Sequence, residues 1–158
     1  VAKGRDDGFD AIILACFDDT GLAEARRLSG VPTIGIGEAA FHVAMLLGAK
    51  FSVVTTLAIS VPVIEENLRD YGLESACLKV RASEVEVLDL EIDGSSARDK
   101  ISNEMACSLR EEQPGALVLG CAGMADLASQ LSQTHNVPVI DGVASAVGLA
   151  SGLVRLGR

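Results

Sequence analysis

Short apolar segments alternate with helical stretches along most of this chain, and this alternation restricts the fold more than any other feature. The segments that are apolar on both faces are residues 11–15, 31–36, 51–54, 116–119 and 137–140. Such runs are typical of strands in parallel sheets, which are covered on both faces. Strands that alternate with helices of about 10–15 residues predict right-handed parallel crossovers. The sequence therefore predicts an α/β fold.

The helical stretches have recognisable starts and faces. Residues 62–71 follow Ser60, a candidate cap, and place Pro62 in the first helical turn, where its missing N–H costs nothing. Residues 97–112 carry apolar side chains four positions apart on one face. We expect a strand ending near Ala82 and then an irregular acidic loop. The pattern from 51 to 141 predicts about four parallel strands with helices on both faces, and a last helix at about 143–156.

The composition excludes several classes of partner. The chain has 13 basic and 22 acidic residues and a net charge of −9, which argues against binding to nucleic acid or to an anionic membrane. It contains only four Phe, one Tyr and no Trp, so we expect an aliphatic core. No apolar run reaches the roughly 18 residues of a membrane span. The four cysteines favour reduced thiols over a disulfide framework, and we expect a cytoplasmic protein.

An internal repeat organises the chain. Residues 10–16 and 115–121 each form an apolar run that ends in a small residue and a cysteine. Leu follows six residues after each cysteine, and Val-Pro follows 15 residues after Cys16 and 16 residues after Cys121. Matching strand, cysteine, helix and Val-Pro in the same order favours two related α/β units, each presenting one cysteine.

The repeat also predicts the domain organisation. Phe51 and Gly115 are 64 positions apart, whereas the strand equivalent to the one at Gly115 begins at Asp10 in the first unit. By symmetry, about 55 further residues would precede Val1. We therefore expect an incomplete first lobe, made of residues 1–48 with the helix at 143–158, and a second lobe made of residues 49–142.

Both repeat-related cysteines are candidates for chemistry. Ligands of parallel sheets bind beyond the carboxyl ends of the strands, where Cys16 and Cys121 lie. We expect Asp18, Asp19 or Thr20 to cap the helix that follows Cys16. A helix N-terminus lowers a thiol pKa, an effect that Asp18 and Asp19 would oppose at Cys16. Two thiols across one cleft suit a reaction in which a thiolate removes a proton from carbon and a thiol delivers one to the opposite face.

Other residues have simpler interpretations. Cys77 and Cys107 are expected to be inert small hydrophobes. The absence of any C-x-x-C pair argues against a zinc site. The two histidines are not expected to be ligands, because His42 is interpreted as a packing residue and His135 as solvated. Residues 35–37, Gly-Ile-Gly, lack the third glycine of a dinucleotide fingerprint.

Four segments resemble the hydantoin racemases, members of the aspartate/glutamate racemase superfamily. They are Ala-Cys-Phe-Asp-Asp at 15–19, Leu-Gly-Cys-Ala-Gly-Met-Ala-Asp at 119–126, Phe-Ser-Val-Val-Thr-Thr-Leu at 51–57 and Val-Pro-Val-Ile-Asp-Gly at 137–142. The resemblance implies two flavodoxin-like parallel-sheet lobes with one cysteine each, no cofactor, and a homo-oligomer. The family's first strand, with its Asn-Pro-Asn loop, has no counterpart in the sequence.

The resemblance also implies an activity, the racemisation of 5-monosubstituted hydantoins. It implies Cys16 and Cys121 as the acid/base pair, and substrate contacts from Phe17, Thr55, Thr56, Ala122 and Gly123. Allantoin, or aspartate and glutamate, are the alternative substrates. The less polar Cys-Phe-Asp and Cys-Ala-Gly segments favour a ring over an amino acid. An alternative of another class is a non-catalytic α/β module whose cysteines sense redox state, which would form a reversible disulfide.

Overall fold

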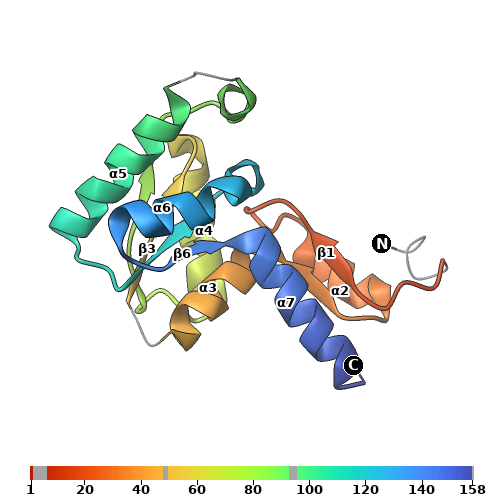
Figure 1. Cartoon of the computed structure of the whole chain (residues 1–158). Helices are drawn as coiled ribbons and strands as arrows, with labels where there is room; N and C mark the ends of the chain where they lie inside the picture. Colours follow the sequence, from red (N-terminus) through yellow and green to blue (C-terminus); the bar gives the residue numbers. More distant parts are fainter. Residues whose placement is uncertain (2–6, 48–49, 93–95, 158) are drawn as a thin grey trace.

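The computed structural model contains two parallel sheets, and it describes Val1 and residues 7–47, 50–92 and 96–157 (Figure 1). The strands β1 (Ile12–Leu14) and β2 (Thr33–Gly35) form a two-stranded sheet. The second sheet has the order β4-β3-β5-β6, from β3 (Phe51–Thr55), β4 (Cys77–Ala82), β5 (Ala116–Leu119) and β6 (Val139–Asp141). All strand pairs are parallel, so the predicted α/β fold and its parallel four-stranded sheet are confirmed.

The helices follow the strands in the predicted order. They are α2 (Leu22–Ser29), α3 (Ile36–Leu46), α4 (Val61–Asp70), α5 (Ala97–Glu111), α6 (Ala128–His135) and α7 (Gly142–Arg155). Short 3-10 turns are η1 (Ala58–Ser60), η2 (Val87–Glu91) and η3 (Ala122–Leu127). Within the described residues, no helix has the length and apolar character that crossing a membrane requires.

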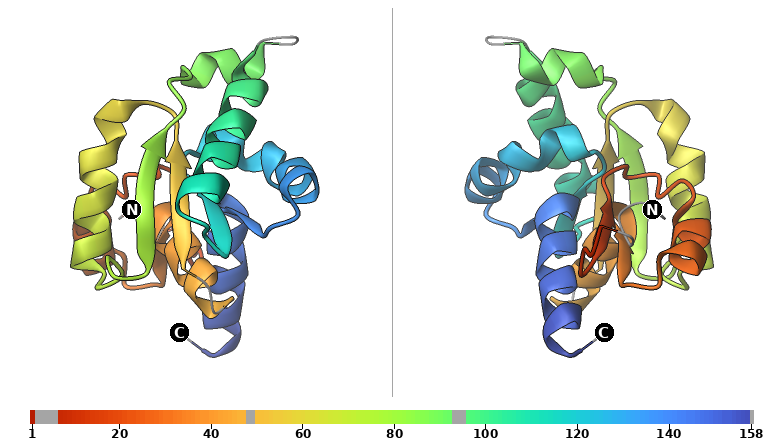
Figure 2. Two further views of the ribbon diagram at one scale, coloured as in Figure 1. Left: turned by 90° about the vertical axis from the view of Figure 1, so that its left-hand side faces the viewer. Right: turned by 90° about the vertical axis from the view of Figure 1, so that its right-hand side faces the viewer.

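Both faces of the four-stranded sheet are covered, as Figure 2 shows with α4 and α5 on opposite sides. Successive residues of β3 and β5 point to opposite faces and enter different cores. Val53 packs in the core that α3, α4 and α7 cover, and Val54 packs with side chains of α5 and α6. These strands are therefore apolar on both faces because each face packs in a separate core.

Helix α3 lies between the two sheets. It contacts β2 of the small sheet, β5 and β6 of the large sheet, and also α4 and α7. Helix α7 in turn contacts α3, β1 and β2. Its start approaches α3 so closely that a Cβ at Gly142 would lie 2.6 Å from the carbonyl oxygen of Ile36. The division into lobes of residues 1–48 with 143–158 and 49–142 stays a prediction.

An aromatic cluster forms part of the larger core, whereas the smaller core is aliphatic, as expected. Phe41 of α3 is fully buried and stacks on Phe51 with ring centroids 5.8 Å apart. It meets Phe17 edge to face at 5.5 Å and Tyr71 at 6.4 Å. Four of the five aromatic residues of the chain therefore gather around one helix.

Candidate active site

Cys16 lies in the turn that follows β1. Its side chain is exposed, and its carbonyl oxygen accepts a hydrogen bond from the Asp19 N–H at 3.1 Å, which closes the turn. The expected capping of α2 by Asp18, Asp19 or Thr20 is wrong, because Gly21 occupies the cap position and α2 has no side-chain cap. The Asp19 carboxylate instead accepts hydrogen bonds from the first turn of α3.

Cys121 lies just beyond β5, and the large sheet holds its position. The preceding residue, Gly120, donates its N–H to the Val54 carbonyl at 2.8 Å and accepts a hydrogen bond from the Thr55 hydroxyl at 2.9 Å. A Cβ at Gly120 would lie 2.9 Å from the Thr55 Cα, so only glycine fits there. The strand end before Cys121 is therefore fixed against β3.

Both cysteines line one pocket of about 310 Å³, a volume in the range of small-molecule sites. Its lining residues are Ala15, Cys16, Phe17, Asp18, Thr56, Ser60, Val87, Gly120, Cys121, Ala122 and Gly123. The pocket thus gathers the turns that follow β1, β3 and β5, together with one residue of η2. These are carboxyl ends of strands from both sheets, where parallel folds bind ligands.

The pocket includes six of the seven residues that the sequence singled out. The exception is Thr55, which is 1% exposed and whose hydroxyl bonds to the Gly120 carbonyl. Phe17 borders the pocket, but the residue is only 4% exposed and its ring packs on Phe41. The roles of all seven residues in substrate binding or catalysis stay predictions.

Five lining residues have no substrate-binding or catalytic role in the sequence prediction: Ala15, Asp18, Ser60, Val87 and Gly120. The sequence suggests Asp18 as a helix cap and as a charge that opposes the Cys16 thiolate, and it suggests Ser60 as a cap of α4, but the Ser60 side chain makes no capping hydrogen bond. Val87 belongs to η2, which packs over the Cys121 turn. A Cβ at Gly123 would lie 3.3 Å from the Val87 side chain, so a small residue is needed where η2 crosses.

The thiol of Cys121 is less acidic than expected from its place at a helix start. Burial raises its pKa, and the nearby Cys16 and Asp18 raise it further. Hydrogen bonds to the sulfur from the Gly123 N–H and the Thr56 hydroxyl act in the opposite direction. The expected lowering of the thiol pKa is therefore wrong for Cys121, because desolvation disfavours the thiolate more than the local donors stabilise it. Burial likewise raises the pKa of the Asp18 carboxyl.

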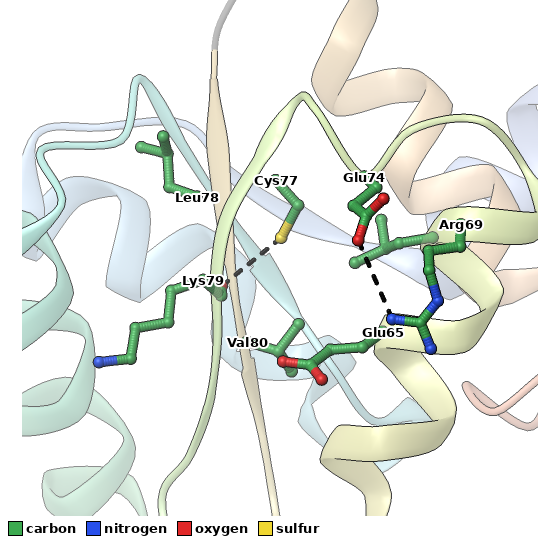
Figure 3. A pocket seen from close by; sticks show the side chains of 8 residues that line it. Glu65, Arg69, Glu74, Cys77, Leu78, Lys79 and Val80 are labelled. Carbon is green, nitrogen blue, oxygen red and sulfur yellow. Dashed lines mark hydrogen bonds and ion pairs between the residues drawn. The ribbon is translucent and has the colours of Figure 1, made fainter.

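A separate pocket lies between β4 and α4 and contains another cysteine, Cys77 (Figure 3). Its thiol donates a weak hydrogen bond to the Lys79 carbonyl at 3.6 Å, and burial raises its pKa to about 12. Such a thiol stays protonated near neutral pH, so Cys77 is poorly suited to act as a base. Across the described residues, no three His, Cys, Asp or Glu side chains gather where a metal ion could bind.

The fold and the pocket define an α/β protein of parallel sheets in which two strand-end thiols share one small-molecule pocket. The Asp/Glu/Hydantoin racemase family matches residues 1–150, and the chain belongs to this family. It is 46% identical to a hydantoin racemase from Rhizobium meliloti over 157 residues, which are 99% of this chain and 65% of that protein. It is 37% identical to a hydantoin racemase from Pseudomonas sp. (strain NS671), covering 100% of this chain and 64% of that protein.

A solved structure shows the same fold. The allantoin racemase from Klebsiella pneumoniae superimposes with a TM-score of 0.93 at 45% sequence identity, covering 99% of this chain and 64% of that chain. The present chain therefore spans just under two thirds of the length of the relatives it matches.

Proposed function

We propose that this protein is a racemase that inverts C5 of 5-monosubstituted hydantoins, with Cys16 and Cys121 as a two-thiol acid/base pair and without a cofactor. The observation that carries the proposal is that both cysteines, from separate sheets, line one pocket of about 310 Å³. The names of the relatives from Rhizobium meliloti and Pseudomonas sp. support the substrate class.

The electrostatics of the pocket support different protonation states for the two thiols. Racemisation by two bases requires one thiolate and one thiol in each turnover. The Cys16 sulfur raises the pKa of Cys121, since two negative charges near each other are disfavoured. This coupling disfavours the state in which both thiols are ionised. The Gly123 N–H and the Thr56 hydroxyl stabilise the Cys121 thiolate when that residue is the base.

In the proposed reaction, the thiolate removes the C5 proton from one face of the ring. The resulting carbanion is delocalised into the adjacent carbonyl as an enolate, and the second thiol delivers its proton to the opposite face. The second sulfur becomes the thiolate, so the reverse reaction uses the same residues in exchanged roles. Each turnover leaves the pair with one proton, and no external acid or base is consumed.

Allantoin is the second candidate substrate, because the solved relative from Klebsiella pneumoniae, at 45% identity, is named an allantoin racemase. Aspartate and glutamate fit the pocket less well. Among its described lining residues, Asp18 is the one with a charged side chain, and its negative charge would repel a substrate carboxylate. The homo-oligomeric state and the cytoplasmic location stay predictions.

An assay of optical rotation tests the proposed function. With enantiopure 5-isobutylhydantoin, in the presence of a thiol reductant and a metal chelator, we expect complete loss of rotation. In D₂O we expect deuterium at C5 in both enantiomers. Enantiopure allantoin, aspartate and glutamate are assayed in parallel to rank the substrates. If none of the ring substrates racemises and the thiols instead form a reversible disulfide that alters binding of a partner, the redox-sensing alternative is favoured.

The pH dependence of exchange tests the charge at Asp18. Exchange that depends on Cys121 as base should rise with pH as its thiolate forms, with a midpoint above the ordinary thiol pKa. Asp18→Asn removes a negative charge that disfavours this thiolate, so the pKa of Cys121 should fall and the midpoint should move to lower pH. Asp126→Asn is the control, because Asp126 is exposed and pairs with Arg98. A midpoint that stays unchanged in Asp18→Asn would contradict the conclusion that the Asp18 charge raises the pKa of Cys121.

A further inference from the structure

The carboxylate of Asp19 is buried within the turn that carries Cys16. The residue is 5% exposed and has a positive φ of 50°. Its Oδ1 accepts the Gly37 N–H at 3.2 Å, and its Oδ2 accepts the Glu38 N–H at 2.7 Å and the Tyr71 hydroxyl at 2.9 Å. Three donors from α3 and from the end of α4 thus converge on one side chain.

Glycines at the start of α3 leave space for this carboxylate. Its cap position is Gly35, which has no side chain to offer, whereas α7 is capped by its own Asp141, which accepts from the Val143 and Ala144 N–H groups. A Cβ at Gly35 would lie 2.1 Å from Oδ1 of Asp19, and one at Gly37 would lie 2.8 Å from Oδ2. The Gly-Ile-Gly segment, which is weak as a nucleotide motif, therefore forms a socket for Asp19.

A second contact ties the same turn to α4. The Asn67 side chain donates to the Asp18 carbonyl at 2.8 Å, next to the Tyr71 contact. Helices α3 and α4 contact each other, and both contribute to the core beneath the large sheet. The turn that carries Cys16 is thus fixed to elements that also define the position of Cys121.

We infer that Asp19 is a positioning residue for Cys16. Its carboxylate, bound in the socket of α3, fixes the Cys16 sulfur across the pocket from Cys121, an inference that rests on the proposed function. The competing explanation is that Asp19 only caps α3 and stabilises the fold. If Asp19 positions Cys16, its loss should slow exchange of the one enantiomer for which Cys16 is the base. If Asp19 only caps α3, its loss should affect both enantiomers alike.

Deuterium exchange at C5, measured separately for each enantiomer, tests the inference. The Cys16-dependent enantiomer is defined as the one whose exchange is lost in Cys16→Ser. We expect Asp19→Ala to slow exchange of that enantiomer by at least about tenfold, because a misplacement of ~1 Å costs up to about 100-fold. Exchange of the other enantiomer should fall by less than about threefold, since Cys121 keeps its position. Asp141→Ala is the matched control, since it removes a comparable cap from α7 and should not discriminate between enantiomers.

A double variant separates positioning from capping. Asp19→Ala with Gly35→Asp gives α3 its own cap, as Asp141 gives α7, but leaves the Cys16 turn detached; the Leu22 side chain must shift, because a Cβ at Gly35 would lie 2.8 Å from its Cδ2. We expect recovery of thermal stability without recovery of the Cys16-dependent exchange. Tyr71→Phe, which keeps the aromatic ring and removes only the hydroxyl, should produce a smaller loss for the same enantiomer.

The outcomes are distinct. Equal losses for both enantiomers in Asp19→Ala and Tyr71→Phe, or full recovery of exchange in the double variant, overturn the inference and leave the proposed function standing. A parent protein that exchanges neither enantiomer overturns the proposed function, and the inference with it.

Discussion

Replacing either pocket cysteine by serine is expected to abolish racemisation while leaving exchange at C5 for a single enantiomer. A serine hydroxyl ionises far less readily than a thiol, so it is a poor base at neutral pH. We expect Cys16→Ser and Cys121→Ser each to lower the racemisation rate by about 100- to 10,000-fold, the range for loss of a general acid or base. In D₂O, the surviving thiolate still removes the C5 proton, exchanges it with solvent and returns a deuteron on its own face. The two variants should therefore exchange opposite enantiomers.

The other two cysteines provide matched controls for this experiment. Cys77 lies in the separate pocket beside β4, and Cys107 lies within α5. Cys77→Ser and Cys107→Ser should leave turnover nearly unchanged, as measured by polarimetry under the same reducing conditions. Parent-level racemisation by Cys16→Ser, or the same enantiomer preference in both pocket variants, would contradict the two-base mechanism.

The sequence predicts the fold best where both faces of a strand are buried. The limits of β5 are those of the apolar run, because all four of its residues are buried. The segment that became β4 was harder to interpret, since Leu78 and Lys79 are exposed and break the apolar pattern. The physical reason is the position of β4 at the edge of the sheet, where only β3 pairs with it.

The site was predictable to the extent that the repeat encodes it. Cys16 and Cys121 follow equivalent strands, and the fold brings both to one pocket. Of the pair Thr55 and Thr56, however, only Thr56 lines the pocket, because successive residues at a strand end point in opposite directions. The sequence alone does not reveal which of the two does so. Val87 lines the pocket from η2, a 3-10 turn whose sequence shows no hydrophobic periodicity that would predict its position.

Long-range partners were beyond the reach of local sequence rules. Asp19 was interpreted as a cap for the helix that follows it, which is the usual role of Asp before a helix. The structure pairs it with Gly37 and Glu38, 18 and 19 positions away. The same limit applies to the core, since a count of aromatic residues does not say whether they meet. Here Phe17, Phe41, Phe51 and Tyr71 come from four parts of the chain and form one cluster.

That cluster leads to the largest expected effect on stability. Phe41 is fully buried and contacts all three of the other rings, so Phe41→Ala removes three aromatic contacts and leaves a cavity. We expect a loss of about 3–5 kcal/mol in the free energy of unfolding, measured by urea denaturation. That loss is a large part of the ~5–15 kcal/mol that stabilises a typical domain.

Two further variants show whether the cluster itself is responsible. Phe9 is 59% exposed, and Phe9→Ala should change the free energy of unfolding by less than about 0.5 kcal/mol, as at most surface positions. Phe41→Leu keeps most of the buried volume but loses the ring contacts, so its effect should lie between those of the two alanine variants. Because Phe17 directly follows Cys16 and packs on Phe41, Phe41→Leu should also slow the Cys16-dependent exchange more than the exchange of the other enantiomer. A Phe41→Ala effect no larger than that of Phe9→Ala would show that the cluster does not hold this part of the fold together.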